Sequence, residues 1–278
     1  MMSDSLIIDR VPVEGSFPSG GVIEVWTINR PNKLNALNNE VIAELKAACK
    51  VAEDDADVRV VVIRGASPEP AEEGKRQKPP AFVAGADITE FTGKKSKDIR
   101  ENFENNAWEA IWNLSIPTIA SIDGFALGGG SEIALSCDIR IASTRSNFGT
   151  PEINLGLIPG GGATQRLARL LGYGKAIEMV MTGEMVSATE AYRIGLVNRI
   201  CEPEELQNTT MLLATTLATK SPLTIKSAKE AVRGALERGM AEGLEFERDL
   251  FCALFDNEDM EIGVNAFLNR ENPEWKGI

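Results

Sequence analysis

One strongly apolar stretch, VRVVVI at residues 58–63, does most to limit what this chain can fold into. A strand with one face in water alternates polar and apolar residues, whereas a strand covered on both faces is apolar almost throughout. Five of these six residues are apolar. We therefore expect 58–63 to be a strand that is covered on both faces of its sheet.

Strands and helices alternate through the first half of the chain, which predicts an α/β core. Besides 58–63, strands are predicted at 22–28, 116–122 and 138–142. Asn38 and Asn39 can cap a helix whose apolar positions follow helical spacing, namely Val41, Ile42, Leu45, Ala48 and Ala52. A second helix is predicted at 99–114, and residues 124–136 are predicted to be a turn that enters a third helix.

The second half of the chain is predicted to be almost wholly helical from residue 164 onward. Helices are predicted at 187–195, 204–220, 222–238 and onward to 269. We therefore divide the chain into an α/β core at 1–200 and a helical part at 201–278. A charged, proline-bearing loop at 66–80 interrupts the core and shows no pattern of its own.

Composition argues against several classes of partner. The chain has 29 basic and 41 acidic residues, for a net charge of −12. Because binding nucleic acid mainly means neutralising phosphates with Lys and Arg, we expect no nucleic-acid partner. No apolar run approaches the roughly 18 residues that span a bilayer, so we expect no membrane partner. The first ten residues resemble neither a signal peptide nor a transit peptide, which predicts a cytoplasmic protein.

Histidine is absent from the 278 residues. Ser-His and Cys-His nucleophiles and histidine-based zinc sites are therefore absent too. The four cysteines lie far apart without paired-ligand spacing, which indicates buried thiols in a reducing compartment and no metal site. Acid–base chemistry near neutral pH would have to use carboxylates, lysine, bound water or one of the two tyrosines.

Three short stretches suggest chemistry: FVAGADI at 82–88, GGGSE at 128–132 and FGTPE at 148–152. Each also has an ordinary structural explanation. A glycine triplet is commonly a tight turn, and a glutamate near a helix start commonly favours the positive end of the helix dipole. A Pro-Glu pair is commonly part of a solvated loop.

Placement favours a functional role for the second stretch. If a helix begins near Gly129, its first amides are unpaired and point outward at the positive end of the dipole. Glu132, three residues on, then lies on the same face as the Gly129 amide. An amide that stabilises an anion and a carboxylate that moves a proton would address one small volume. This arrangement suits a reaction that builds negative charge on a carbonyl oxygen.

Long blocks of the chain resemble one known superfamily. Residues 119–139, IASIDGFALGGGSEIALSCDI, resemble its signature over their whole length. FVAGADI and the block that starts FGTPEINLGLIPGGGATQRLARLLG match two further motifs, and NRPNKLNAL from Asn29 resembles the first. AFLNR and PEWKG, near the C-terminus, resemble the usual ending. The superfamily is that of crotonase (enoyl-CoA hydratase/isomerase), and the motifs are most similar to those of short-chain enoyl-CoA hydratases.

The resemblance implies a spiral of ββα units, with a C-terminal helical part that mediates trimerisation and caps the site for coenzyme A (CoA). It implies a homotrimer or homohexamer that binds an acyl-CoA and needs no further cofactor, since CoA is part of the substrate. By the family pattern, the Ala86 and Gly129 amides form an oxyanion hole for the thioester carbonyl. The implied CoA or substrate contacts are Asn32, Lys33, Leu34, Ala84, Asp87, Ile88, Phe267 and Arg270. Arg270 stands where lysine is usual, which puts its phosphate contact in doubt.

The acids present decide the reaction that the resemblance implies. Hydratases of this superfamily hold one glutamate in the GGGxE block and another in the PE block, and this chain has both, Glu132 and Glu152. The implied function is reversible syn addition of water to a 2-enoyl-CoA in fatty acid metabolism, giving a 3-hydroxyacyl-CoA, with dehydration as the reverse. Two carboxylates facing one water share a proton, because like charges at short range raise one pKa.

Alternatives remain at this point. The chain could be an isomerase of the Δ3-Δ2 type, an acyl-CoA hydrolase or a decarboxylase of the same superfamily. It could also be a non-catalytic relative that binds RNA, although the net charge argues against this. A group of aromatic residues could close the acyl pocket to short chains such as crotonyl- or 3-hydroxypropionyl-CoA, or could belong to the core. These residues are Phe91, Phe103, Trp108 and Trp112.

Overall fold

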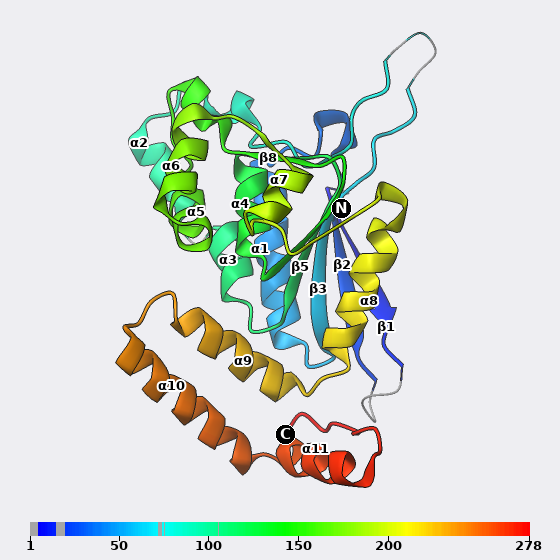
Figure 1. Ribbon diagram of the computed structural model, residues 1–278. Coiled ribbons are helices and arrows are strands. Elements are labelled where there is room, and N and C mark those ends of the chain that lie inside the picture. Colours follow the sequence, from blue (N-terminus) through cyan, green and yellow to red (C-terminus); the bar gives the residue numbers. More distant parts are fainter. Residues whose placement is uncertain (1–4, 15–19, 72–73, 75, 105) are drawn as a thin grey trace.

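The computed structural model describes residues 5–14, 20–71, 74, 76–104 and 106–278, and its strands form two sheets (Figure 1). The larger sheet has the order β1 (Leu6–Pro12), β2 (Val22–Ile28), β3 (Val58–Gly65), β5 (Thr118–Ile122), β7 (Ile139–Ser143) and β10 (Arg199–Cys201). The smaller has the order β4 (Ala81–Val83), β6 (Phe125–Leu127), β8 (Asn147–Gly149) and β9 (Val186–Ser187).

Successive strands leave one sheet and enter the other. β5 is followed after two residues by β6, which leads into the helix α4 (Gly129–Ser136), and β7 is followed after three residues by β8. β3, β5 and β7 pair in parallel in the larger sheet, and β4, β6 and β8 pair in parallel in the smaller. Repeated strand–strand–helix turns therefore build a spiral, which confirms the predicted fold class.

Helices surround these sheets (Figure 1). They are α1 (Asn39–Asp54), α2 (Ser96–Phe103), α3 (Ala107–Asn113), α4, α5 (Ala163–Leu171), α6 (Tyr173–Thr182), α7 (Ala188–Arg193), α8 (Leu206–Ala218), α9 (Pro222–Gly234), α10 (Met240–Ala253) and α11 (Glu258–Asn269). Short 3-10 turns complete the chain: η1 (Pro31–Lys33), η2 (Ile88–Phe91), η3 (Pro151–Leu155), η4 (Pro203–Glu205) and η5 (Leu254–Asp256).

The apolar strand β3 is covered on both faces, as its sequence predicts. Val61 and Ile63 belong to one hydrophobic cluster, which includes apolar residues of α1, α3 and α4. Val60 and Val62 point the other way, into a second cluster with residues of α8. Because side chains alternate along a strand, one apolar run supplies both cores.

The helix predicted after Asn38 is confirmed, and the helix predicted at 99–114 is wrong. The Asn38 side chain accepts a hydrogen bond from the Val41 amide (3.1 Å) and so caps α1. Within 99–114 there are two helices, α2 and α3. The Asn106 side chain accepts from the Glu109 amide (2.9 Å) and donates to the Phe103 carbonyl (2.9 Å), which ends one helix and starts the next.

The C-terminal helices divide between the sheet and one end of the molecule. α8 packs on the sheet, whereas α9, α10 and α11 lie together at the end away from β8 and α6 (Figure 1). α9 ends at Gly234 rather than 238. The division of the chain at residue 200 stays a prediction. Over the described residues, no helix is both long and apolar enough to cross a membrane.

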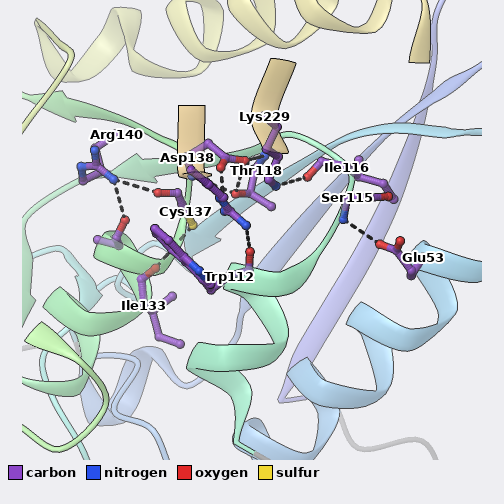
Figure 2. Close-up of polar contacts among 12 residues, drawn as sticks. Glu53, Trp112, Ser115, Ile116, Thr118, Ile133, Cys137, Asp138, Arg140 and Lys229 are labelled. Atoms are coloured by element: carbon purple, nitrogen blue, oxygen red, sulfur yellow. Dashed lines mark hydrogen bonds and ion pairs between the residues drawn. The ribbon is translucent and has the colours of Figure 1, made fainter. Parts of the chain in front are cut away.

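Asp138 joins α9 to the core (Figure 2). Its carboxylate lies 2.7 Å from the Lys229 ammonium and 2.7 Å from the Arg233 guanidinium, both on α9. It also accepts from the Thr118 amide (2.8 Å), and Lys229 donates to the Ile116 carbonyl (2.7 Å). Burial lowers the pKa of Lys229, while the nearby Asp138 charge acts in the opposite direction.

Candidate active site

Three consecutive glycines bring α4 against its neighbours. Gly128 precedes the helix with φ 51° and ψ −124°, and a Cβ there would lie 2.9 Å from Glu152 Oε1. At Gly130, a Cβ would lie 2.1 Å from the Val83 carbonyl oxygen, so α4 packs directly on β4. The helix begins at Gly129, as its sequence predicts, and the glycines allow a close approach that no side chain would permit.

The backbones of Ala86 and Gly129 lie close together. A Cβ built on Gly129 would be 3.7 Å from the Ala86 nitrogen. Leu37 bridges the residues on either side of Ala86, donating to the Gly85 carbonyl (2.9 Å) and accepting from the Asp87 amide (2.7 Å). Across the described ranges, neither the Ala86 nor the Gly129 amide donates to a protein acceptor. Two unpaired donors on neighbouring backbone segments are what an oxyanion hole requires, and this role for Ala86 and Gly129 stays a prediction.

Arg30 fixes the loop that carries Ala86. Its guanidinium lies 3.0 Å from Asp87 Oδ2 and donates to the Ala36 carbonyl (2.5 Å). The Thr89 hydroxyl donates to the other Asp87 oxygen (2.7 Å). The pKa of Asp87 is lowered by these hydrogen bonds, from Thr89 first and then from Arg30. Asp87 is therefore engaged within the loop, and Ile88 beside it is exposed.

Glu132 is buried in the first turn of α4, where 3% of its surface is exposed. Its Oε1 accepts from the Ala163 amide (3.1 Å) at the start of α5. Burial raises the pKa of Glu132 to about 7, and the nearby Glu152 charge acts in the same direction. The Ala163 amide and the positive charge of Arg166 oppose this rise. Near neutral pH, the Glu132 carboxyl group is therefore protonated in part of the molecules and ionised in the rest.

Glu152 follows Pro151 at the start of η3 and faces Gly128. Burial raises the pKa of its half-buried carboxyl group. Its Oε2 is buried and has no hydrogen-bond partner within the part of the chain that the structure describes. A buried carboxylate oxygen without a partner is costly unless water or a ligand reaches it. The two glutamates therefore come from different turns of the spiral, and Glu152 lies near enough for its charge to raise the pKa of Glu132.

Aromatic side chains pack beside Glu132. The Trp108 indole N–H donates to the Gly129 carbonyl (3.1 Å), and its ring stacks with Phe103 at 5.9 Å between centroids. A Cβ at Gly161 would lie 2.7 Å from both Trp108 and Glu132 Oε2. Trp108 is thus part of the core and also borders the acid, while closure of the acyl pocket by this group stays a prediction.

The other two aromatic residues of this group lie elsewhere. The ring of Trp112 faces the guanidinium groups of Arg166 and Arg233, at 4.9 Å and 4.1 Å (Figure 2 shows Trp112). Phe91 is 41% exposed at the end of η2. We therefore infer that Phe103 and Trp108, rather than Trp112, can limit the space beside Glu132.

The residues predicted to contact CoA fall into two groups. Leu34 accepts from the Ala84 amide (3.1 Å), which places η1, with Asn32 and Lys33, beside the loop that bears Ala86. Phe267 and Arg270 are exposed and belong to the α11 end of the molecule, away from β8 (Figure 1). This chain does not bring them to its own pair of glutamates.

Sequence reasoning missed the segment of residues 161–163 and Arg166, which surround the inner side of Glu132. The run GGGATQR carries these residues, and its glycine triplet was the available signal. No group of three or more Cys, Asp or Glu side chains with metal-ligand geometry occurs among the residues that the structure describes.

A ββα spiral with one buried and one half-buried glutamate, near the unpaired amides of Ala86 and Gly129, is typical of an α/β protein of the crotonase type. The chain belongs to the enoyl-CoA hydratase/isomerase family, whose model matches residues 19–278. It is 42% identical over 256 residues to a probable enoyl-CoA hydratase of Rhizobium meliloti, covering 92% of this chain and 95% of that protein. It is 39% identical over 256 residues to the short-chain-enoyl-CoA hydratase of Clostridium acetobutylicum, covering 91% of this chain and 94% of that protein.

A solved structure supports the same placement. The crystal structure of an enoyl-CoA hydratase subunit from Geobacillus kaustophilus superposes with a TM-score of 0.87 at 37% identity, covering 99% of this chain and 98% of that one. Likeness over nearly the whole of both chains includes the C-terminal helices as well as the spiral.

Proposed function

We propose that this protein is an enoyl-CoA hydratase that adds water reversibly, in the syn sense, to a 2-enoyl-CoA. The observation that carries the proposal is the convergence of Glu132 and Glu152 beside the unpaired amides of Ala86 and Gly129. Hydration needs a base for water, an acid for Cα and donors for the thioester oxygen, and these four groups supply all three.

The glutamate pair works with one shared proton. Burial raises the pKa of both carboxyl groups, and repulsion between them acts on Glu132 in the same direction. Because coulombic repulsion is mutual, the pair titrates as a unit and keeps one proton over an intermediate pH range. The ionised member takes a proton from water as its oxygen attacks Cβ, and the protonated member donates to Cα. Dehydration of a 3-hydroxyacyl-CoA uses the same groups in reverse.

The amides of Ala86 and Gly129 stabilise the intermediate. As water adds, negative charge grows on the thioester oxygen, and two fixed N–H donors stabilise it without rearranging. Removing one such donor in comparable sites costs about 3 kcal/mol of transition-state stabilisation. Arg30 and Trp108 hold the two amides in place, through Asp87 and the Gly129 carbonyl respectively.

A short acyl chain is the substrate that we propose. The ring of Trp108, which stacks on Phe103, packs beside Glu132 at Gly161, and we expect it to restrict a long acyl tail in that direction. One relative, from Clostridium acetobutylicum, is named a short-chain-enoyl-CoA hydratase. If a long-chain enoyl-CoA turned over faster than crotonyl-CoA, this part of the proposal would be wrong.

We further propose that the CoA site is completed by a neighbouring copy in a homotrimer or homohexamer. Asn32, Lys33, Leu34 and Ala84 lie beside the Ala86 loop, whereas Phe267 and Arg270 do not reach it within one chain. Three apolar residues one helical turn apart on α11, Val264, Phe267 and Leu268, are 50%, 84% and 71% exposed, and a contiguous exposed apolar surface is typical of an interface. The free state of all four cysteines favours a reducing, cytoplasmic location.

The test is the loss of the conjugated double-bond absorbance of crotonyl-CoA, with Glu132→Gln and Glu152→Gln beside the wild type. Glu178→Gln is the matched control, because Glu178 is an exposed glutamate on α6 that forms an ion pair with Lys175 at the surface. Fast loss in the wild type and the control, with collapse in both site variants, supports the proposal.

Product masses separate the alternatives. Only hydration adds one water and keeps CoA attached; isomerisation leaves the mass unchanged, hydrolysis releases CoA and decarboxylation loses carbon dioxide. No turnover of any enoyl-CoA by the folded protein, together with salt-sensitive binding of single-stranded RNA, would refute the enzymatic proposal in favour of a binding protein.

A further inference from the structure

Residues 161–163 form a thin partition between two charged groups. On one side, the Ala163 amide donates to Glu132 Oε1 (3.1 Å). On the other, Arg166 Nη1 donates to the Gly161 carbonyl (2.8 Å). One short stretch of backbone thus presents N–H groups to an acid and a carbonyl to a guanidinium. Any movement of this stretch would move the hydrogen bond that Glu132 accepts.

Glycine is required on the Arg166 side of the partition. Gly162 has φ 110°, and a Cβ there would lie 2.1 Å from Arg166 Nη1. The guanidinium therefore occupies the space that a side chain at Gly162 would take. The ring of Trp112, 4.9 Å away, faces the same guanidinium. An aromatic face and a carbonyl thus hold Arg166 against the partition.

We infer that Arg166 is a positioning residue for Glu132, holding residues 161–163 so that the Ala163 amide fixes the orientation of the Glu132 carboxylate. The inference rests on the proposed function only for its kinetic consequences, because the contacts themselves do not depend on the reaction. Arg166 touches neither the paired amides nor Glu152 in any described contact, so its effect on catalysis passes through the partition.

Arg166 also acts on Glu132 through its charge. The charged groups that act on Glu132 are Glu152, which raises its pKa, and Arg166, which lowers it. Those that act on Arg166 are Glu132 and Glu109, which favour its charged form, and Arg233, which opposes it; the Cys137 thiol is a smaller influence. Removing the guanidinium should therefore raise the pKa of Glu132 further above its ordinary value.

Open space beside the Arg166 side chain leaves room for substitutions of Arg166. A cavity of about 770 Å³ borders Gly161, Gly162 and Arg166 and extends toward α9. Arg166→Met keeps an unbranched aliphatic side chain and removes the charge. Arg166→Lys keeps the charge and loses the planar guanidinium group with its several N–H donors. The matched control is Arg169→Met, because Arg169 is exposed one turn further along α5 and its contacts are with Gln165 and Leu236.

The kinetic test measures kcat and KM for crotonyl-CoA across pH in these variants. For Arg166→Met we expect kcat to fall up to about 100-fold, as for a small misplacement of a catalytic group, with a smaller change in KM. In the profile of kcat against pH, we also expect the limb that reports ionisation of the glutamate pair to move to higher pH. Arg166→Lys should show the wild-type dependence of kcat on pH and should recover part of the lost kcat. Arg169→Met should match the wild type in both kcat and its dependence on pH.

A second readout does not require activity. The carboxyl band of Glu132 in infrared difference spectra, assigned by its loss in Glu132→Gln, reports its protonation directly. An upward shift of its titration in Arg166→Met, but not in Arg169→Met, supports the inference even if the wild type hydrates no substrate. If folded Arg166→Met gave the wild-type titration and the wild-type kcat, the inference would be wrong. If Arg166→Met failed to fold, Arg166→Lys with an unchanged kcat would equally overturn it.

Discussion

The buried carboxyl group of Glu132 should make this protein less stable as pH rises, and Glu132→Gln should remove that effect. Burial raises the pKa of Glu132 from 4.5 to about 7 in the folded state. Between these two pH values the folded chain holds a proton that the unfolded chain releases. The contribution of this proton is fully present below about pH 4.5 and is lost as pH rises through 7. Glutamine is neutral at every pH and keeps an oxygen that can accept from the Ala163 amide.

The magnitude follows from the size of the pKa shift. Each pKa unit corresponds to about 1.4 kcal/mol, so a rise from 4.5 to about 7 corresponds to roughly 3 kcal/mol. Solvent screening reduces this free energy only slightly, because Glu132 is 3% exposed. The difference in unfolding free energy between Glu132→Gln and the wild type should therefore grow by roughly 3 kcal/mol, in favour of the variant, from pH 4.5 to pH 8.

The assay is denaturant unfolding at a series of pH values, with both proteins at the same protomer concentration because assembly contributes to stability. Glu178→Gln, at the surface of α6, serves as the control and should run parallel to the wild type. Glu152→Gln should show an intermediate slope, since the charge that helps to raise the pKa of Glu132 is gone. If the Glu132→Gln and wild-type curves ran parallel from pH 4.5 to pH 8, the burial argument would be refuted.

Three further substitutions test the packing around the site. Gly161→Ala places a Cβ 2.7 Å from both Trp108 and the Glu132 carboxylate; we expect kcat for crotonyl-CoA to fall more than 10-fold, and a wild-type rate would contradict the close packing. Trp108→Phe loses the indole donor to the first carbonyl of α4, and we expect a loss of about 1 kcal/mol in denaturant unfolding together with a lower kcat. Asp138→Asn leaves the buried Lys229 ammonium without its carboxylate, and we expect about 3 kcal/mol of destabilisation by thermal unfolding, against none if α9 is held by apolar contacts alone.

The features that could be predicted from the sequence were those set by local chemistry. The cap at Asn38 needs only its own side chain and an amide three residues on, so the start of α1 was readable. The apolar run of β3 required cover on both faces, and the structure provides it from α8 on one side and from α1, α3 and α4 on the other. The start of α4 followed from glycines ahead of an apolar helix.

The features that could not be predicted depend on partners far away in the sequence. β4, β6 and β8 have three residues each, too few to show alternation, and they exist because they pair with one another across the spiral. The break inside 99–114 depends on Asn106, whose side chain donates a hydrogen bond to the Phe103 carbonyl and accepts one from the Glu109 amide. Apolar residues at helical spacing on both sides of Asn106 suggested one continuous helix. The contact of Arg166 with residue 161 could not be foreseen without the turn at Gly162.

The same burial explains both the reactivity of the site and its cost in stability. A carboxyl group in water would be almost fully ionised at neutral pH and would have no proton to donate. Close backbone packing at Gly130 and Gly161 removes water from Glu132 and raises its pKa into the neutral range. Exposing Glu132 to solvent would stabilise the fold at neutral pH. It would also lower the pKa of Glu132, so that the carboxyl group would be ionised and would have no proton to donate. Variants selected only for stability above pH 7 should therefore accumulate at Glu132 itself and should lose hydration, whereas Gly130 and Gly161 should be retained, because a Cβ there would lie 2.1 Å and 2.7 Å from neighbouring atoms.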